Sequence, residues 1–486
     1  MNLLQGLKEN TDLTRTTNGA IVYSTTGEEL VDFFYAVGAS RNDSKLINVF
    51  ERSFRVMPLE TLKVLFYARD VRGGMGERKS FRRILKHASM KYPVTMAKNI
   101  DAIVEFGRYD DLLWMLSTPA KNQVLAYIDR QLADDILSDY PSLLGKWLPS
   151  ENASGKITKK NSHIVRKYLG LTCKDYGNML SDLRRKINIV ERHICSKEWN
   201  NIEFEKLPSY AMKRYKNVFL KHCPDAYRAY LDSLIKGEKK VNAKTLYPYD
   251  IIKEIVGYNG RTQYGLDQET KDLMNEMWKA LPDYLEGSEE NILVVADTSA
   301  SMWGTPYHSA IALAIYTAQR NKGMFHNHFI TFSESPRLVQ IKHERLEHIC
   351  NSIKDIYSNT NVEKVFKLIL NTAVNNNLPQ EEMPSRIVIV SDMQFDFMTS
   401  GNTSLPMFVN IKKQYEAAGY KLPGLVFWNV AAETNNFPMK TDERGIQMVS
   451  GHSPAIFKDL LADKFSTPLE LVLRAINKER YNLVKL

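Results

Sequence analysis

The chain has 486 residues, of which 44% are hydrophobic and 25% are charged, and it carries a formal net charge of +9. This length exceeds what one hydrophobic core supports and predicts two or three domains of ordinary globular composition. No apolar run approaches the roughly 20 residues that span a bilayer, and the first residues lack the apolar stretch of a secretory signal. We therefore expect a cytoplasmic protein with no membrane partner.

The cysteines agree with a reducing compartment. They stand at 173, 195, 223 and 350 and form no C-x-x-C pair, so a disulfide framework is not expected. A zinc site built from His193, Cys195, His222 and Cys223 is an alternative, but its spacing is irregular. Ordinary core and surface roles are the favoured interpretation of these four side chains.

Residues 1–28 are polar and are interpreted as an N-terminal arm. From residue 29 to residue 286 the sequence alternates between short amphipathic helical patterns and breaks. Helices this short bury their apolar stripes only against neighbouring helices. The prediction for 29–286 is an all-α solenoid that resembles HEAT repeats, although no clean sequence period is visible.

A glycine-rich stretch lies in this region, at residues 69–79 (RDVRGGMGERK). It places Arg69, Arg72, Arg78 and Lys79 around three glycines that free the backbone for close approach. The Gly-Lys-Ser/Thr ending of a phosphate-binding P-loop is absent. Two interpretations stay open: a loop that approaches phosphates, and an ordinary turn between helices with solvated arginines.

The excess of positive charge is concentrated in residues 151–222, which contain 16 basic and 7 acidic residues. Tyr168, Tyr176, Trp199, Tyr210 and Tyr215 are interleaved with the basic residues. Cations attract phosphates and aromatic faces stack unpaired bases, so this combination is typical of RNA binding. A solvated helical face is the alternative for any one cluster. Together with the glycine-rich stretch, the candidate RNA-binding residues are Arg69, Arg72, Arg78, Lys79, Lys156, Lys159, Lys160, Arg166, Lys167, Arg184, Arg185, Lys186, Lys213 and Arg214.

Residues 291–486 alternate strands with helices, which predicts a parallel, Rossmann-type α/β domain. Residues 291–301 (NILVVADTSAS) form a buried strand pattern that ends at Asp297, followed by Ser299 and Ser301. A second such strand, 386–391, ends before Asp392, and Thr360 precedes a helical pattern. Hard oxygen donors at the carboxyl ends of neighbouring strands suit Mg²⁺ or Mn²⁺.

This oxygen set resembles the metal-ion-dependent adhesion site of von Willebrand factor A domains. The resemblance implies that Asp297, Ser299, Ser301, Thr360 and Asp392 hold the cation, with an open position for an anionic ligand. An A domain that keeps these residues only as loop caps and binds no metal is the alternative.

Several phrases in the helical region resemble the TROVE module of the Ro ribonucleoprotein family. They are YARDVRGGMGER (67–78), GRYDDLL (107–113), KWLPSEN (146–152), LRRKINIVE (183–191) and LPSYAMKRY (207–215). The resemblance implies a ring of HEAT-like helices closed by the A domain. It also implies that the outer face binds structured small RNA and that the hole accepts the single-stranded end of misfolded RNA.

Two functions therefore compete at this point. The first is an RNA-binding, Ro-like scaffold with a magnesium-binding A domain. The second is a metal-dependent protein-interaction or assembly module, without RNA binding, that captures an acidic side chain of a protein partner. An enzyme is not expected, because no adequate set of a placed base and nucleophile is found: the G-x-S-x-G motif is absent, and Ser299 stands where an aspartyl-phosphate enzyme needs a second aspartate.

Overall fold

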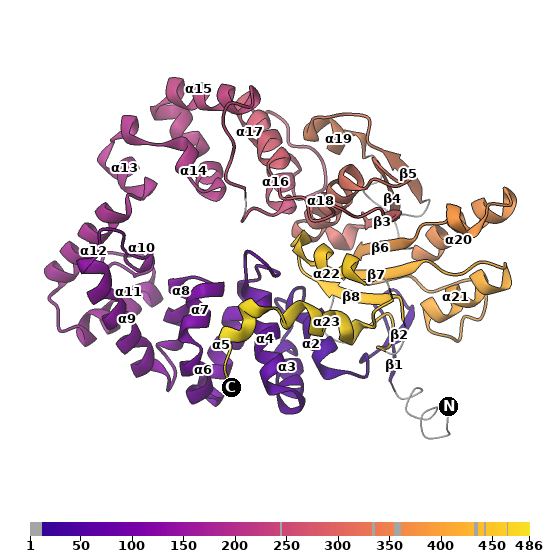
Figure 1. The fold of residues 1–486 in the computed structure, drawn as a ribbon, viewed down its shortest axis with the longest axis horizontal. Helices are drawn as coiled ribbons and strands as arrows, with labels where there is room; N and C mark the ends of the chain where they lie inside the picture. Colours follow the sequence, from indigo (N-terminus) through magenta and orange to yellow (C-terminus); the bar gives the residue numbers. More distant parts are fainter. Residues whose placement is uncertain are drawn as a thin grey trace.

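The chain folds into a mostly helical N-terminal domain and a C-terminal domain built on a mixed β-sheet (Figure 1). A computed structural model describes residues 12–243, 245–332, 336–353, 361–431, 436–441, 444–463 and 465–486. Buried apolar side chains of both domains form one continuous cluster. Within the described residues, no helix has the length and apolar content that crossing a membrane requires.

Local sequence signals set many of the helix ends. Proline opens α4, α15 and α16, where its missing N–H removes no helical hydrogen bond. Thr172 caps α12 by accepting from the Asp175 N–H at 3.2 Å. The helices are α2 (Glu29–Val37), α3 (Leu46–Val56), α4 (Pro58–Arg69), α5 (Lys79–Lys91), α6 (Pro93–Lys98), α7 (Ile100–Phe106), α8 (Tyr109–Leu112), α9 (Lys121–Leu137), α10 (Leu144–Trp147), α11 (Lys156–Tyr168), α12 (Cys173–Ile187), α13 (Val190–Ser196), α14 (Ser209–His222), α15 (Pro224–Ile235), α16 (Pro248–Ile255) and α17 (Gln268–Lys279).

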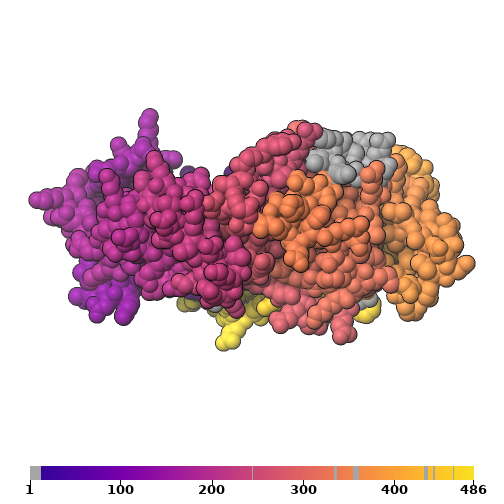
Figure 2. Space-filling model, turned by 90° about the horizontal axis from the view of Figure 1, so that it is seen from above, coloured from indigo at the N-terminus to yellow at the C-terminus, as the bar shows by residue number. Residues whose placement is uncertain are grey.

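Successive helices pack on one another along a curved path that begins and ends at the C-terminal domain (Figure 1). At one end α2 packs against strand β8 (Ile446–Ser450), and at the other α16 packs against α18 (Thr305–Arg320). In the view turned by 90° the two domains abut along the long axis of the molecule (Figure 2). The helical region predicted for residues 29–286 is thus confirmed in its class, while the HEAT-like repeat stays a prediction.

The C-terminal sheet has six strands in the order β5-β4-β3-β6-β7-β8, and only β5 runs antiparallel to its neighbour. Besides β8, the strands are β3 (Ile292–Asp297), β4 (His328–Phe332), β5 (Arg337–Gln340), β6 (Arg386–Ser391) and β7 (Gly424–Asn429). Every residue of β3 and β6 is buried, as their apolar runs predict. The other helices are α19 (Leu346–Ser352), α20 (Val362–Asn375), α21 (Met407–Ala417), α22 (Phe457–Ala462) and α23 (Pro468–Ile476).

The strand order reverses between β3 and β6. From β3 the chain continues outward to β4, and from β6 it continues in the opposite direction to β7. The segments that follow these two adjacent strands therefore diverge from one point at the edge of the sheet. Open α/β sheets place ligands at such a switch point, and Asp297 and Asp392 both lie there.

The prediction that residues 1–28 form an N-terminal arm is wrong for the described part of this segment. Residues Leu13–Arg15 (β1) and Ile21–Tyr23 (β2) form an antiparallel hairpin. Thr16 Oγ1 donates to the Phe395 carbonyl at 2.7 Å, and the Tyr23 N–H donates to the Phe437 carbonyl at 2.8 Å. The β-branched run of β2 pairs with the C-terminal domain, and polar neighbours mask this in the sequence. Residues 1–11 lie outside the described residues.

The C-terminal segment returns to the helical domain. Helix α23 packs against α2 and α4 of the helical domain as well as against β8. The 3₁₀ helix η7 (Glu479–Leu483) follows and contacts α4. Lys485 N then donates to Asn99 Oδ1 at 2.8 Å. Asn99 is also the residue between α6 and α7, at the end of one helix and the start of the next.

Candidate functional site

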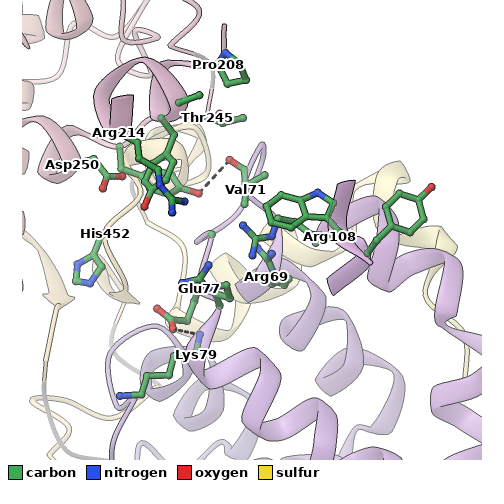
Figure 3. A pocket seen from close by; sticks show the side chains of 18 of the residues that line it. Arg69, Val71, Glu77, Lys79, Arg108, Pro208, Arg214, Thr245, Asp250 and His452 are labelled. Carbon is green, nitrogen blue, oxygen red and sulfur yellow. Dashed lines mark hydrogen bonds between the residues drawn. The ribbon is translucent and has the colours of Figure 1, made fainter. Parts of the chain in front are cut away.

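A cavity of about 2280 Å³ lies where the helical and C-terminal domains face each other (Figure 3). Its wall includes the loop after α2, the glycine-rich loop, α12, α14 and α16, and the C-terminal domain contributes Thr305, Pro306 and His452. Pockets for small molecules usually measure about 300–1000 Å³. The cavity is therefore large enough for a segment of a polymer.

The described residues that line the cavity carry a marked excess of positive charge. Thirteen are basic and five are acidic. The lining also includes six Tyr and Trp side chains: Tyr109, Trp147, Tyr210, Tyr215, Tyr247 and Tyr249. Walls of one charge sign raise the local concentration of ligands of the opposite sign. The cavity suits an anionic polymer with aromatic or heterocyclic groups.

Arg78 is a cation of this wall whose charge is not balanced by a carboxylate in contact with it. Its guanidinium makes no hydrogen bond or ion pair with a described residue, and it is exposed to the cavity. Burial lowers the pKa of Arg78, and the neighbouring Arg108 and Arg82 lower it further. A bound phosphate would relieve this repulsion between guanidinium groups.

Two other arginines lie over aromatic rings of the wall. Arg108 is fixed by Asp110, whose carboxylate oxygens accept from its Nε at 2.9 Å and its Nη2 at 2.6 Å. Its guanidinium lies 3.9 Å from the centroid of the Trp147 ring. Arg214 lies 5.6 Å from the Tyr215 centroid. Such pairs combine a cation for phosphate with a flat face for a base.

The cavity brings together half of the predicted RNA-binding residues. Those in its wall are Arg69, Arg72, Arg78, Lys79, Arg184, Arg185 and Arg214. The others, Lys156, Lys159, Lys160, Arg166, Lys167, Lys186 and Lys213, are not among the lining residues. Lys156, Lys159 and Lys160 are exposed on α11. The predicted set thus divides between the cavity and other surfaces.

Several of the predicted residues are engaged in contacts that hold the protein together, and Arg69, Arg184 and Lys213 are three of them. Arg69 is buried, and its Nε donates to Asp111 Oδ2 at 2.8 Å. Arg184 donates to two backbone carbonyls and to Ser150, each at 3.0 Å. Lys213 is buried and donates to the Asp250 carbonyl at 3.0 Å. The sequence shows that these side chains are positively charged, but it does not show which groups of the folded protein they bind.

The glycines of the glycine-rich loop are explained by close packing. Gly76 has φ +64°, and a Cβ there would overlap the Tyr247 hydroxyl. A Cβ at Gly74 would overlap the Tyr67 carbonyl. The backbone of the loop is therefore pressed against the helical domain, while Arg72 and Arg78 line the cavity.

The second candidate site is the oxygen cluster at the switch point of the sheet. Asp297 accepts from the Ser299 N–H at 2.9 Å and from Ser391 Oγ at 2.6 Å. The hydroxyls of Ser299 and Ser301 lie 3.0 Å apart. Asp392 accepts from the Gln394 N–H at 3.0 Å. Thr360, the fifth predicted ligand, lies outside the described residues.

The electrostatics of this cluster fit a divalent cation. Asp297 and Asp392 are buried, and burial together with the nearby Asp392 raises the pKa of Asp297. Burial also raises the pKa of Asp392, which the Ser301 hydroxyl opposes. Two buried carboxylates with serine hydroxyls are the hard oxygen donors that Mg²⁺ and Mn²⁺ prefer. Asp297, Ser299, Ser301 and Asp392 could hold such an ion, and none of them lines the cavity.

The residues of the alternative zinc site have other partners. Nε2 of His193 lies 2.7 Å from Asn188 Oδ1, and the His222 ring stacks on Trp199. Among the described residues, no group of three or more His, Cys, Asp and Glu is arranged to hold a metal.

Other residues in the cavity wall were missed by the sequence analysis. Arg108 and Trp147 stand inside two of the quoted phrases, which was the available signal. Arg41, Lys253 and His452 lie in segments with no charge cluster or motif. Only the tertiary structure brings them to one wall.

A family model described as Domain of unknown function (DUF2828) matches residues 16–139 and 143–289, more than half of the chain. The chain belongs to the DUF2828 family. A second model, Domain of unknown function (DUF7788), matches residues 291–481. "Uncharacterized protein L728" of Acanthamoeba polyphaga mimivirus is 28% identical over 510 residues, which cover 96% of this chain and 87% of that protein.

A crystal structure of the Deinococcus radiodurans RO (RSR) protein is similar with a TM-score of 0.44 and 14% sequence identity, covering 95% of this chain and 100% of that chain. In the DUF2828 protein described here, both matched regions contribute to the cavity. Residues from Ala39 to Lys253 come from the DUF2828 match, and Thr305, Pro306, Val430, Ala431 and His452 come from the DUF7788 match.

Proposed function

We propose that this protein is an RNA-binding, Ro-like scaffold that holds a single-stranded segment of small or misfolded RNA in its cavity. The observation that carries the proposal is the cavity wall, in which thirteen basic side chains outnumber five acidic ones and six aromatic rings are interspersed. Phosphate attraction and base stacking together are the usual means of binding single strands. A volume of about 2280 Å³ accommodates several nucleotides.

The cations that would contact phosphates are those not committed to protein partners. Arg78 and Arg214 form no ion pair with a described residue, and Arg72 has only an exposed, 3.4 Å contact with Glu105. An exposed ion pair of this kind contributes little and exchanges readily for a phosphate. Arg72, Arg78 and Arg214 are therefore the proposed phosphate contacts.

The proposal includes a closed ring. The packing of α2 on β8 and of α16 on α18 supports it, because both ends of the helical array then depend on the C-terminal domain. A strand in the cavity would be enclosed by both domains. Lys156, Lys159 and Lys160, exposed on α11, are proposed contacts for a structured part of the RNA outside the cavity.

Binding of a fluorescent single-stranded RNA, measured by anisotropy over a range of salt concentrations, tests this proposal. Affinity should fall with salt, with a slope of about 0.7 for each phosphate contact. Arg78→Glu combined with Arg214→Glu should weaken binding at least tenfold and flatten the slope. Lys413→Glu combined with Lys421→Glu is the charge-matched control, because both lysines are exposed outside the cavity. Absence of RNA binding at low salt would rule the proposal out.

A second function is supported by a separate observation, the cluster of Asp297, Ser299, Ser301 and Asp392. We propose that this cluster binds Mg²⁺ or Mn²⁺ as in a von Willebrand factor A domain, and that the ion accepts an acidic side chain of a protein partner. The two neutral hydroxyls leave the ion electrophilic toward a carboxylate. EDTA should abolish capture of such a partner and leave RNA binding intact, because the cluster does not line the cavity. Partner capture that survives both EDTA and Asp297→Ala would exclude this role.

A further inference from the structure

The N-terminal hairpin, formed by β1 and β2, packs on the loop that carries Asp392. This loop, residues 392–397, follows β6 at the switch point of the sheet. Thr16 lies in the bend between β1 and β2, and its hydroxyl donates to the Phe395 carbonyl at 2.7 Å, although 379 positions separate the two residues. Figure 1 shows the hairpin beside the C-terminal domain. A segment from the N-terminal part of the chain thus contacts a loop of the oxygen cluster.

Further hydrogen bonds join the hairpin to this loop. The Thr17 N–H donates to Gln394 Oε1 at 2.8 Å, and Asn18 Nδ2 donates to the Gln394 carbonyl at 2.7 Å. In return, the Phe397 N–H donates to the Asn18 carbonyl at 3.1 Å. Because these bonds involve backbone groups of the loop, they restrict the path of its chain and not only the positions of its side chains.

The loop contains a backbone conformation that needs support from its surroundings. Met393, which follows Asp392, is buried and has φ +62°. This is the left-handed region, which residues other than glycine rarely occupy because their Cβ atom approaches the backbone. Such conformations persist where the surrounding structure determines them. The hairpin supplies part of this constraint, since it binds Gln394 and Phe395 directly after Met393.

Gln394 connects the hairpin to the carboxylate of Asp392. Its N–H donates to Asp392 Oδ1 at 3.0 Å, while its carbonyl and side-chain oxygens accept from the hairpin. Before Met393 in the chain, Ser391 Oγ donates to Asp297 Oδ2 at 2.6 Å and accepts from the Met393 N–H at 3.0 Å. Movement of Gln394 would therefore turn the Asp392 carboxylate relative to Asp297.

We propose that the hairpin positions Asp392 for the cation, with Thr16 and Gln394 as positioning residues of the oxygen cluster. The inference rests on the proposed binding of Mg²⁺ or Mn²⁺ by this cluster, and it adds a dependence on a segment outside the α/β domain. Groups that orient metal ligands change the affinity for the ion by about 10–100-fold when they are removed. The cation, and the acidic partner that it would accept, then bind fully only when the hairpin is docked.

Titration of the full-length protein with Mn²⁺, in which electron paramagnetic resonance measures the free ion, gives the Kd for the cation. Thr16→Val removes the hydrogen bond to the Phe395 carbonyl and keeps the shape of the side chain. Gln394→Met removes the acceptor of the Thr17 N–H and keeps a side chain of similar length. Each variant should raise the Kd about tenfold, because the loop no longer holds Asp392 in one orientation.

Three controls separate positioning from stability. Binding that Asp297→Ala abolishes is assigned to the oxygen cluster. Thr16→Ser keeps the hydroxyl and should retain the Kd of the unmodified protein to within about twofold. Thr118→Val is the matched control in the helical domain, because Thr118 is buried and its hydroxyl donates to the Met115 carbonyl, also at 2.7 Å. As at Thr16, this hydroxyl also accepts from a nearby backbone N–H.

Thermal unfolding in EDTA compares the stabilities of the variants, and circular dichroism checks that each is folded at the temperature of the titration. Thr118→Val should lose stability as Thr16→Val does, but it should keep the Kd of the unmodified protein. A change in Kd is thereby distinguished from a general loss of stability.

A Kd that rises in Thr16→Val or in Gln394→Met, but not in Thr16→Ser or Thr118→Val, supports the proposal. Gln394→Met decides the matter if Thr16→Val does not fold. A Kd that stays unchanged in both variants, or that rises equally in Thr16→Ser or Thr118→Val, overturns the proposal and leaves the proposed cation site standing. Absence of Mn²⁺ binding at the cluster of the unmodified protein overturns that site and this inference together.

Discussion

The hydroxyl of Tyr481 donates a hydrogen bond of 2.9 Å to Oδ2 of Asp70, although 411 positions separate the two residues in the chain. Arg480 Nη2 donates to Oδ1 of the same carboxylate at 3.0 Å, as does the Arg72 N–H. Asp70 is buried in the glycine-rich loop that lines the cavity. The C-terminal segment thereby fixes a loop of the helical domain.

Tyr481→Phe should lower the free energy of unfolding by about 1–3 kcal/mol, because a buried carboxylate loses a donor that nothing replaces. The shift of the urea midpoint measures this loss. Tyr140→Phe is the control, since Tyr140 is 94% exposed and its change should stay within about 0.5 kcal/mol. Equal midpoints for the two variants would contradict the role given to the C-terminal segment.

Gly76→Ala should destabilise the protein more than Gly237→Ala. Both glycines have positive φ, at +64° and +74°, so the added methyl costs about 1–2 kcal/mol of backbone strain at each. Only at Gly76 does the new Cβ also meet the Tyr247 hydroxyl, whereas Gly237 has open space. Denaturant titration of both variants isolates the packing contribution. A Gly76→Ala variant as stable as Gly237→Ala would show that the loop relaxes away from Tyr247.

Mg²⁺ or Mn²⁺ should stabilise the unmodified protein, by about 2.7 kcal/mol at a concentration 100 times the Kd. Asp297→Asn should lose this response. In EDTA the same variant should be at least as stable as the unmodified protein, because the repulsion between residue 297 and Asp392 is removed. Thermal unfolding with and without the cation measures both effects. Asp139→Asn, at an exposed position of the helical domain, should retain the response, and an unchanged response in Asp297→Asn would argue against the site.

Two buried histidines should cost stability as the pH falls below about 6.5, whereas the raised pKa of Asp297 acts in the opposite direction. Burial lowers the pKa of His308 and of His452, and Arg41 and Lys253, which face His452 with Tyr249, lower the latter further. The unfolded chain then binds more protons than the folded one, so each histidine costs up to about 1.4 kcal/mol for each pH unit below its unfolded pKa.

Urea midpoints between pH 7.5 and pH 5.5 measure this dependence. Relative to the unmodified protein, His452→Gln should lose less stability on acidification by the share of one histidine, whereas His348→Gln, at an exposed position, should not alter the profile. Identical pH profiles for the two variants would show that His452 takes up a proton without cost in the folded protein.

The strands that carry the oxygen cluster were predictable from the sequence. Runs such as 292–297 and 386–391 are apolar without alternation, which is typical of strands buried on both faces. A residue that ends such a strand in a parallel sheet lies at the ligand-binding edge. That Asp297 and Asp392 lie at the same edge of the sheet was therefore predictable from the sequence.

The cavity wall was predictable only in part. Local periodicity predicts the individual helices and strands, but it does not show which distant segments of the chain meet in the wall. Arg78 and Arg214 belong to basic clusters that are visible in the sequence. Nothing in the sequence indicates that Arg69 donates to Asp111, or that Lys213 donates to the Asp250 carbonyl. His452 has no sequence signal at all. Its position depends on the packing of the two domains around the cavity.

Ultraviolet crosslinking of a bound single-stranded RNA, followed by mass spectrometry of the crosslinked peptides, tests the central claim most directly. The account predicts crosslinks at Trp147, Tyr210 and Tyr215 in the cavity wall, and their loss in the Arg78→Glu, Arg214→Glu variant. Crosslinks confined to exposed aromatic residues outside the cavity, such as Tyr140 and Tyr264, would contradict it.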